Sequence, residues 1–139
     1  MAKKPKMWVS SPPRAPAPKV PPNVITDVQQ KAAQCVETQL KPKHIQAPPA
    51  PDAAQYNYLV DIDTKWYRHY FYFCAKYCSP GPNAIAPFFE TKFARLEYTG
   101  ADRFTLSFMR YTDEWVELQA DLSIEECLAS IQDDPLFNP

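Results

Sequence analysis

The chain has 139 residues, of which 45% are hydrophobic and 22% are charged, and its formal net charge is −1. This length fits a single domain, and the longest apolar stretches are far shorter than the ~20 residues needed to span a bilayer. The N-terminal region also lacks the apolar run of a signal peptide. We therefore expect a soluble, cytoplasmic protein with no membrane partner.

The first 22 residues, MAKKPKMWVSSPPRAPAPKVPP, are predicted to form a basic, proline-rich arm. They contain seven prolines, no glycine and no acidic residue. Such a segment favours the extended polyproline II conformation, and either a free tail or an arm lying along a partner fits this composition. If it is a binding arm, its candidate contact residues are Trp8, Arg14 and Lys19.

Residues 23–139 are predicted to form one α+β domain, which begins with a helix over 23–40. Apolar residues recur there at helical spacing, and Pro42 is expected to end the helix. A second proline-rich stretch, 41–55, then reads as a surface connector. The predicted buried stripe of this helix is Ile25, Val28, Ala32, Cys35 or Val36, and Leu40.

Residues 56–120 are predicted to form an antiparallel meander sheet of four or five strands, because apolar residues there alternate with period two. In the later strands, Ala94, Leu96 and Tyr98 share one face, and Phe104, Leu106 and Phe108 point inward. A capping box of Ser123 and Glu126 begins a last helix over 123–134. Both helices are expected to cover one face of the sheet.

The stretch TKWYRHYFYFC, residues 64–74, places six aromatic rings in eight consecutive positions. We expect it to lie in the longest strand, 65–78, which bends or follows a tight turn at Asp63-Thr64. Strict alternation then divides its side chains between two faces. One face carries Trp66, Arg68, Tyr70, Tyr72 and Cys74, and the other, toward the helices, carries Tyr67, His69, Phe71, Phe73, Ala75 and Tyr77.

Trp, Tyr and Arg are the residues enriched at interface hot spots, because they bury a large area and keep a polar group. The leading hypothesis is therefore a non-enzymatic interaction protein that docks on a protein partner or a larger assembly. Docking would use the aromatic and arginine face of the sheet together with the basic arm. The predicted contact residues on the sheet are Trp66, Arg68, Tyr70 and Tyr72.

Two alternatives from other classes stay open. One is a small ligand-binding protein or enzyme with an aromatic-lined pocket on the sheet. The other is an accessory protein that binds nucleic acid by stacking bases on the rings. The chain is acidic after residue 43, with fourteen acidic residues against seven Lys or Arg, and this balance weighs against nucleic acid.

No motif predicts a catalytic residue, a metal site or a cofactor. The chain has only two glycines, which excludes a phosphate-binding glycine loop. Cys74 and Cys78, with His69, lie too far apart on a regular strand to share a zinc ion. The carboxylates of Asp61 and Asp63 share a face, but such a pair is a weak indication of Mg²⁺. The four cysteines are expected to be reduced.

Three stretches carry a resemblance to a known family: TKWYRHYFYFCAKYCSPGPNAIAPFFETKFARLEY, DRFTLSFMRYTDEW and LSIEECLASIQDDP. Over residues 56–135 the chain resembles a family of small, uncharacterised bacterial proteins. The resemblance implies a single small domain with no assigned activity, so no functional residue is carried over. The family pattern has a histidine where Tyr111 stands and a glycine where Asp113 stands, so any site that uses this imidazole would be absent here.

Overall fold

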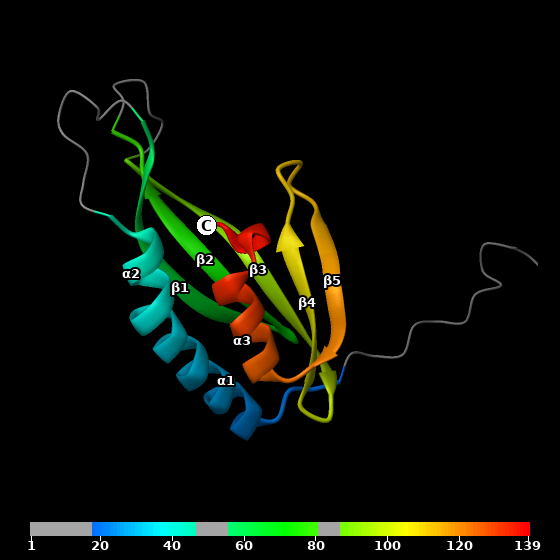
Figure 1. Cartoon of the computed structure of the whole chain (residues 1–139). Helices are drawn as coiled ribbons and strands as arrows, with labels where there is room; N and C mark the ends of the chain where they lie inside the picture. The colour runs from blue at the N-terminus through cyan, green and yellow to red at the C-terminus, as the bar shows by residue number, and fades with distance from the viewer. Residues whose placement is uncertain (1–17, 47–55, 81–86) are drawn as a thin grey trace, which may run out of the picture.

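The computed structural model describes residues 18–46, 56–80 and 87–139. Five antiparallel strands form one sheet in the order β1-β2-β3-β4-β5, with helices before and after it (Figure 1). This architecture confirms the predicted α+β meander. The elements are α1 (Pro22–Cys35), η2 (Val36–Leu40), α2 (Lys41–His44), β1 (Tyr58–Tyr67), β2 (Tyr70–Cys78), β3 (Phe88–Gly100), β4 (Arg103–Met109), β5 (Trp115–Leu122), α3 (Ile124–Asp133) and η4 (Pro135–Phe137).

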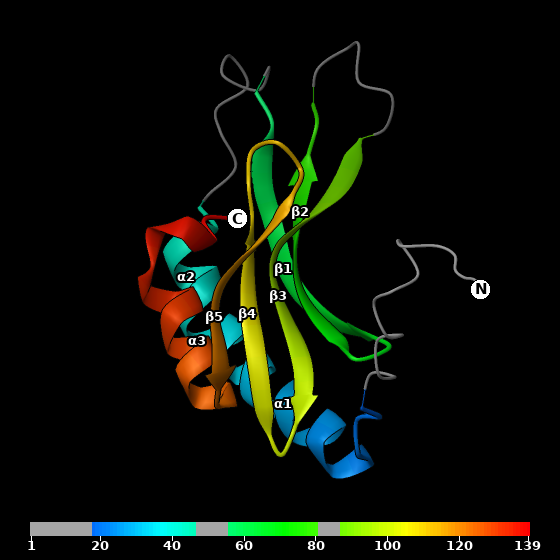
Figure 2. The ribbon, with the colours of Figure 1, turned by 90° about the vertical axis from the view of Figure 1, so that its right-hand side faces the viewer.

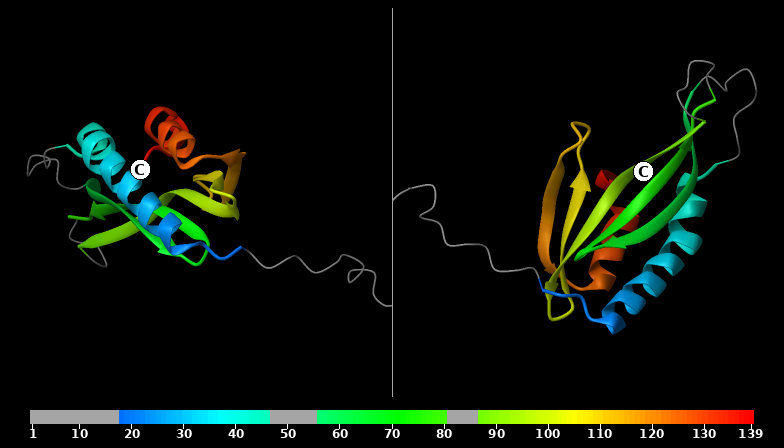
Figure 3. Two further views of the ribbon diagram at one scale, coloured as in Figure 1. Left: turned by 90° about the horizontal axis from the view of Figure 1, so that it is seen from below. Right: turned by 180° about the vertical axis from the view of Figure 1, so that it is seen from behind.

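The helices lie side by side on one face of the sheet, as the sequence predicted (Figures 2 and 3). Helix α1 contacts β1, and α3 contacts β4 and β5, so the two helices together cover the width of the sheet. Among the described helices, none is long and apolar enough to cross a membrane.

The hydrophobic core fills the space between the helices and the sheet. On the sheet side, large buried side chains such as Phe71, Phe104 and Leu106 come from strand positions that face the helices, and the helices supply others. Pairing of Phe71 with Leu96 and of Leu96 with Leu106 joins three strands into one apolar row. The side chains that complete the core include Val28, Ala32, Leu40, Ile62, Phe73, Phe104, Ile131 and Phe137.

The first helix extends beyond Pro42, which was predicted to end it. Residues 22–44 are helical throughout, and the turn Val36–Leu40 is a π-helix. In this turn the Lys41 N–H donates to the Val36 carbonyl, five residues back. A widened turn at this place gives room to a proline, which has no N–H and would crowd the carbonyl four residues earlier in a regular α-helix.

The predicted long strand over 65–78 is wrong, because a tight turn divides it. Strand β1 passes through Asp63-Thr64 without a turn, and the chain reverses at Arg68 and His69, a two-residue turn between Tyr67 and Tyr70. Arg68 has a φ of 56°, the left-handed conformation that a tight hairpin requires.

Because of this turn, the side chains before it lie on the opposite faces from those predicted. Trp66 pairs with Phe71 and shares the helical face with it, their ring centroids lying 5.1 Å apart. Its indole Nε1–H donates to the Ile25 carbonyl of α1 at 3.3 Å. Trp66 therefore packs against the core, and Tyr67 takes an exposed place on the other face.

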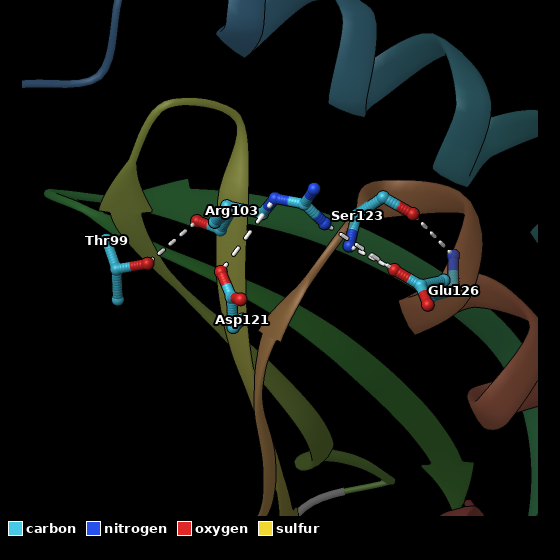
Figure 4. A network of polar contacts seen from close by, with 5 residues as sticks. All are labelled: Thr99, Arg103, Asp121, Ser123 and Glu126. Atoms are coloured by element: carbon cyan, nitrogen blue, oxygen red, sulfur yellow. Dashed lines mark hydrogen bonds and ion pairs between the residues drawn. The ribbon is translucent and has the colours of Figure 1, made fainter.

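The predicted start of the last helix is confirmed. The Glu126 N–H donates to Ser123 Oγ, and the Ser123 N–H donates to the Glu126 carboxylate, which completes a capping box (Figure 4). Arg103 lies at the same corner, 3.7 Å from Glu126 and 3.8 Å from Asp121. The corner fixes the direction in which α3 returns over β4 and β5.

Three stretches of the sequence predictions lie outside the described residues. They are residues 1–17, with Trp8 and Arg14 of the arm, most of the connector (47–55), and residues 81–86 within the predicted sheet region. At the edge of the last stretch the Ser79 N–H donates to the Pro87 carbonyl at 2.8 Å.

Leu106 provides a test of the core. Its side chain is 0% exposed, so Leu106→Ala should lower the free energy of unfolding by about 2–5 kcal/mol through lost transfer energy and an unfilled cavity. Urea denaturation measures this change. Leu118, 39% exposed, is the control, and Leu118→Ala should cost less than about 0.5 kcal/mol. Equal losses for the two variants would contradict this description of the core.

Candidate functional site

The face of the sheet opposite the helices, here called the open face, is the candidate functional surface. Among the described residues, no helix or strand packs over it (Figure 3). Side chains that alternate with the core positions point toward it, as period-two geometry requires. Its chemistry therefore depends on what the strands carry at those positions.

Five residues form a cluster of aromatic rings and cations on the open face, here called the ring cluster. They are Tyr70 and Tyr72 of β2, Lys92 and Arg95 of β3, and Trp115 of β5. The Tyr72 ring centroid lies 6.1 Å from that of Tyr70 and 5.9 Å from that of Trp115. The Arg95 guanidinium carbon lies 4.7 Å from the Tyr70 centroid and 4.9 Å from the Trp115 centroid.

Lys92 completes the cluster, with its ammonium nitrogen 5.6 Å from the Tyr72 centroid. Cation–π contacts of this kind contribute about 0.5–1 kcal/mol each when exposed and about 2 kcal/mol when desolvated. The ring cluster is therefore held together by its own contacts and has a defined shape before any ligand arrives.

Strand β4 supplies the floor of the ring cluster. Arg95 pairs with Ser107 across β3 and β4, and Trp115 lies one strand further, on β5. Because neighbouring strands are about 4.8 Å apart, the indole must pass over β4 to reach Arg95. Ser107 and Thr105, which face away from the helices, are accordingly only 1% and 7% exposed. Their small side chains leave room for the indole.

Arg95 carries an unused hydrogen-bond donor. Its Nε is buried and has no acceptor among the described residues. A buried donor without a partner costs about 1–3 kcal/mol, and more when the group is charged. Because Nε is closed to solvent, an arriving oxygen could reach it only if the stacked rings moved, so the unpaired donor is a cost within the ring cluster and not an open binding position.

One end of the ring cluster continues to the β1–β2 turn. The His69 ring centroid lies 4.1 Å from that of Tyr70, and His69 Nε2 lies 3.2 Å from the Glu97 carboxylate. Beyond His69 is a depression of about 470 Å³, lined by Pro18, Lys19, Val20, Ile25, Arg68 and His69. The depression therefore adjoins the cluster through His69.

The open face also carries acidic side chains beside its cations. Pairing with open-face residues of neighbouring strands places Asp63, Glu90, Glu97 and Glu117 there. Glu90 lies 3.7 Å from Lys65, and burial together with Glu90 and Asp61 raises the pKa of Asp63. The surface is of mixed charge, unlike the continuous basic groove of a protein that binds single strands of nucleic acid.

The structure brings together only part of the predicted contact set. Tyr70 and Tyr72 lie in the ring cluster. Lys19 and Arg68, far apart in the sequence, line one depression, and the Arg68 guanidinium lies 5.4 Å from the Tyr67 ring. Trp66, by contrast, belongs to the helical face, for the reason of parity given above. Trp8 and Arg14 lie outside the described residues.

The predicted contact residues did not include Arg95, Trp115 and Lys92. The signal for Arg95 was present, because placing Ala94 and Leu96 on the helical face puts the residue between them on the other face. Simple alternation does not place Lys92 correctly, because the pairing of β2 with β3 shifts register at a bulge near Phe93. Nothing in the alternation alone connects Trp115 to a strand two positions away in the sheet.

The cysteines of the described core are poor nucleophiles. Burial, together with Glu90 and Asp63, raises the pKa of the Cys74 thiol to about 11. Burial and Glu126 raise the pKa of Cys127 to about 12, and burial raises that of Cys35. Within the described ranges, no three His, Cys, Asp or Glu side chains gather in a way that would hold a metal ion.

Comparison with known proteins gives a family and no activity. Residues 20–139 match a family described as a domain of unknown function, DUF3024. The chain belongs to this family. The DUF3024 match spans every described helix and strand, including the ring cluster. No curated protein matches the chain, and no solved structure does.

The raised thiol pKa values predict an order of alkylation. The thiolate is the reactive species. Because their pKa values are raised, the buried Cys74 and Cys127 carry little thiolate at about pH 8 and should react slowly. Cys78, which is partly exposed, should take up iodoacetamide first. Peptide mass spectrometry after timed quenching gives the order. Modification of Cys127 before Cys78 in the folded protein would contradict the described burial.

Proposed function

We propose that this protein is a non-enzymatic interaction protein whose open face docks on a protein partner. The observation that carries the proposal is the ring cluster, which combines two Tyr, one Trp and one Arg on a sheet face that no described element covers. Tyr, Trp and Arg are the residue types enriched at the centres of protein interfaces.

The geometry of the cluster supports a docking role in two ways. First, the rings are held by stacking on Arg95 and on one another, so few side-chain rotamers would be lost on binding, and the entropic cost of docking is lower. Second, the Arg95 guanidinium and the Lys92 ammonium place positive charge among the rings. A partner that brings carboxylates to this face gains charge-assisted contacts.

The two alternatives have weaker support. Of the residues predicted on the sheet, Arg68 lines the depression that adjoins the ring cluster, together with Lys19 and His69. Trp66, Tyr70 and Tyr72 do not line it. For nucleic acid, the carboxylates of Glu97 and Glu117 lie on the same face as Arg95 and would repel phosphates. A protein surface with groups of both signs is the better match.

Site-specific photo-crosslinking tests the docking face. Tyr67, exposed on the open face beside Tyr70, is replaced by p-benzoylphenylalanine in the full chain and irradiated in the cells that produce it. We expect a covalent adduct with a partner protein. The matched position is Gln34, exposed on the helical side, where the same probe should give no adduct.

Trp115→Ala in the Tyr67 probe background should remove the adduct, because loss of a hot-spot tryptophan costs about 2 kcal/mol or more, roughly 30-fold in affinity. Tyr111→Ala is the control, since Tyr111 is 91% exposed at the β4–β5 turn and lies outside the cluster. Adducts formed only from Gln34, or equally with and without Trp115, would refute the proposal.

A salt series distinguishes binding of nucleic acid from binding of a protein partner. Binding of a fluorescent single-stranded oligonucleotide to the intact chain is measured at increasing salt. We expect no binding that depends on Trp115. Tight binding that falls steeply with salt, as release of counterions from phosphates requires, and that is lost in Trp115→Ala would favour nucleic acid over a protein partner.

A further inference from the structure

The depression of about 470 Å³ at the β1–β2 turn brings together basic side chains from two distant parts of the sequence. Lys19 comes from the residues before α1, and Arg68 and His69 form the turn itself. The side chains of Lys19 and Arg68 are exposed. The depression is therefore an accessible region of positive charge at one end of the ring cluster.

Two hydrogen bonds fix the walls of this depression. The Tyr98 N–H donates to the His69 carbonyl at 2.8 Å, which ties the turn to β3. The Trp66 indole Nε1–H donates to the Ile25 carbonyl at 3.3 Å, which ties β1 to the start of α1. The backbone around the depression is thus held in place before any ligand binds, and this lowers the cost of binding.

The lining of the depression combines apolar and basic side chains. Pro18, Val20 and Ile25 supply the apolar part, and Val20 is only 7% exposed. Binding sites in proteins typically pair an apolar surface with a few polar groups that fix the orientation of the ligand. A ligand for this depression should therefore carry an apolar part beside its charged group.

The two cations of the depression have no carboxylate partner in the described part of the chain. The ion pairs there involve other Lys and Arg side chains, but neither Lys19 nor Arg68. The Arg68 guanidinium carbon instead lies 5.4 Å from the centroid of the Tyr67 ring. A contact with a ring face leaves the in-plane N–H donors available to a carboxylate, which Arg binds with two parallel hydrogen bonds.

Helix α1 adds to the positive potential of the depression. Its first turn has no side-chain cap and no acidic residue, so no side chain of that turn offsets the partial positive charge at the helix N-terminus. Val20 and Ile25, which lie just before and just after the start of α1, both line the depression. A negative group there is favoured by the helix as well as by the two cations.

The balance of charge favours a carboxylate over a phosphate. Glu97 lies 3.2 Å from His69 Nε2, so the depression has an acidic neighbour. Lys19, Arg68 and Glu97 together carry one formal positive charge, which matches a single carboxylate. A phosphate monoester carries about −1.5 to −2 at pH 7, and Glu97 would repel it more strongly.

We propose that the depression binds an aspartate or glutamate side chain of the partner that docks on the open face, an inference that rests on the function proposed above. Arg68 and Lys19 hold the carboxylate, and an apolar neighbour in the partner's sequence lies against Val20 and Ile25. The His69 ring, 4.1 Å from the Tyr70 ring between centroids, joins this contact to the ring cluster. The contact segment of the partner thus pairs an acidic residue with an apolar one.

Nuclear magnetic resonance of the isotope-labelled full chain tests the site with a defined probe. N-acetyl-Glu-Leu amide is titrated in at constant ionic strength, and N-acetyl-Gln-Leu amide, which lacks the carboxylate, is the control. We expect the backbone amide signals of Lys19, Arg68 and His69 to shift toward saturation with the Glu peptide and to stay in place with the Gln peptide. Equal shifts with both peptides overturn the proposal, as do shifts with inorganic phosphate alone, which would assign the site to phosphate.

Two variants test the cations without disturbing the fold. Arg68→Gly removes the guanidinium without straining the turn, because glycine readily adopts a φ of 56°. Arg68→Gly and Lys19→Gln should each weaken binding of the Glu peptide several-fold. Arg110→Gln is the control, since it removes the same charge from an exposed residue just after β4. Unchanged binding in both depression variants contradicts the proposal.

The inference and the proposed function fail separately. In the Tyr67 crosslinking experiment, Lys19→Gln should lower the yield of the partner adduct several-fold, and Arg110→Gln should not. If the depression binds the Glu peptide and no adduct forms from Tyr67, the function proposed for the open face is wrong. If Trp115→Ala removes the adduct but the depression binds no peptide and Lys19→Gln leaves the yield unchanged, the open face docks on its partner and the acidic contact is wrong.

Discussion

The structure depends on one constraint, the two-residue turn at Arg68 and His69 that fixes the parity of β1 against β2. Side chains of a strand alternate between the two faces of the sheet, so a shift of the turn by one residue would move every side chain of the strand to the other face. With the turn at this place, Trp66 meets Phe71 over the core, and Tyr70 and Tyr72 point away from the helices. The left-handed backbone of Arg68 is a cost that the pairing on both sides of the turn offsets.

The same alternation gives the sheet two layers of different character. Under the helices, the rows that contain Phe71, Leu96 and Leu106 are apolar and closed. On the other side, the Arg95 guanidinium lies close to the rings of both Tyr70 and Trp115, and Ser107 of the intervening β4 is buried. This second layer is ordered like a core, yet it retains a cation and polar ring groups at its surface. It is therefore suited to bind a partner without first rearranging.

Much of the fold was predictable because its signals are local. The capping box of Ser123 and Glu126, the stripe of α1 and the common face of Ala94, Leu96 and Tyr98 each follow from spacing within one element. The turn at Arg68 and His69 was not predictable in this way, since neither residue is a typical turn former and the aromatic pattern continues through it. Nor does local spacing reveal a π-helical turn that accommodates Pro42.

The candidate site was harder to predict because its parts come from three strands. Tyr70 and Tyr72 followed from the aromatic run, but Arg95 joins them only through the register of β2 with β3, and Trp115 only by reaching over a strand with Ser and Thr at its open-face positions. Such a contact depends on the order of strands in the sheet. In this meander β4 lies between β3 and β5, so the indole of Trp115 reaches Arg95 only across β4. The error in placing Trp66 has the same origin, since parity cannot be carried across an unrecognised turn.

An uncovered layer of rings also poses a problem of solubility. Exposed apolar patches favour association, and β5 is an edge strand whose backbone groups could pair with another chain. Glu117 on β5, with Asp113 and Glu114 just before the strand, opposes such pairing, because charged side chains on an edge strand disfavour the addition of another strand. The charges on this edge thus allow a layer of rings to stay open on the sheet.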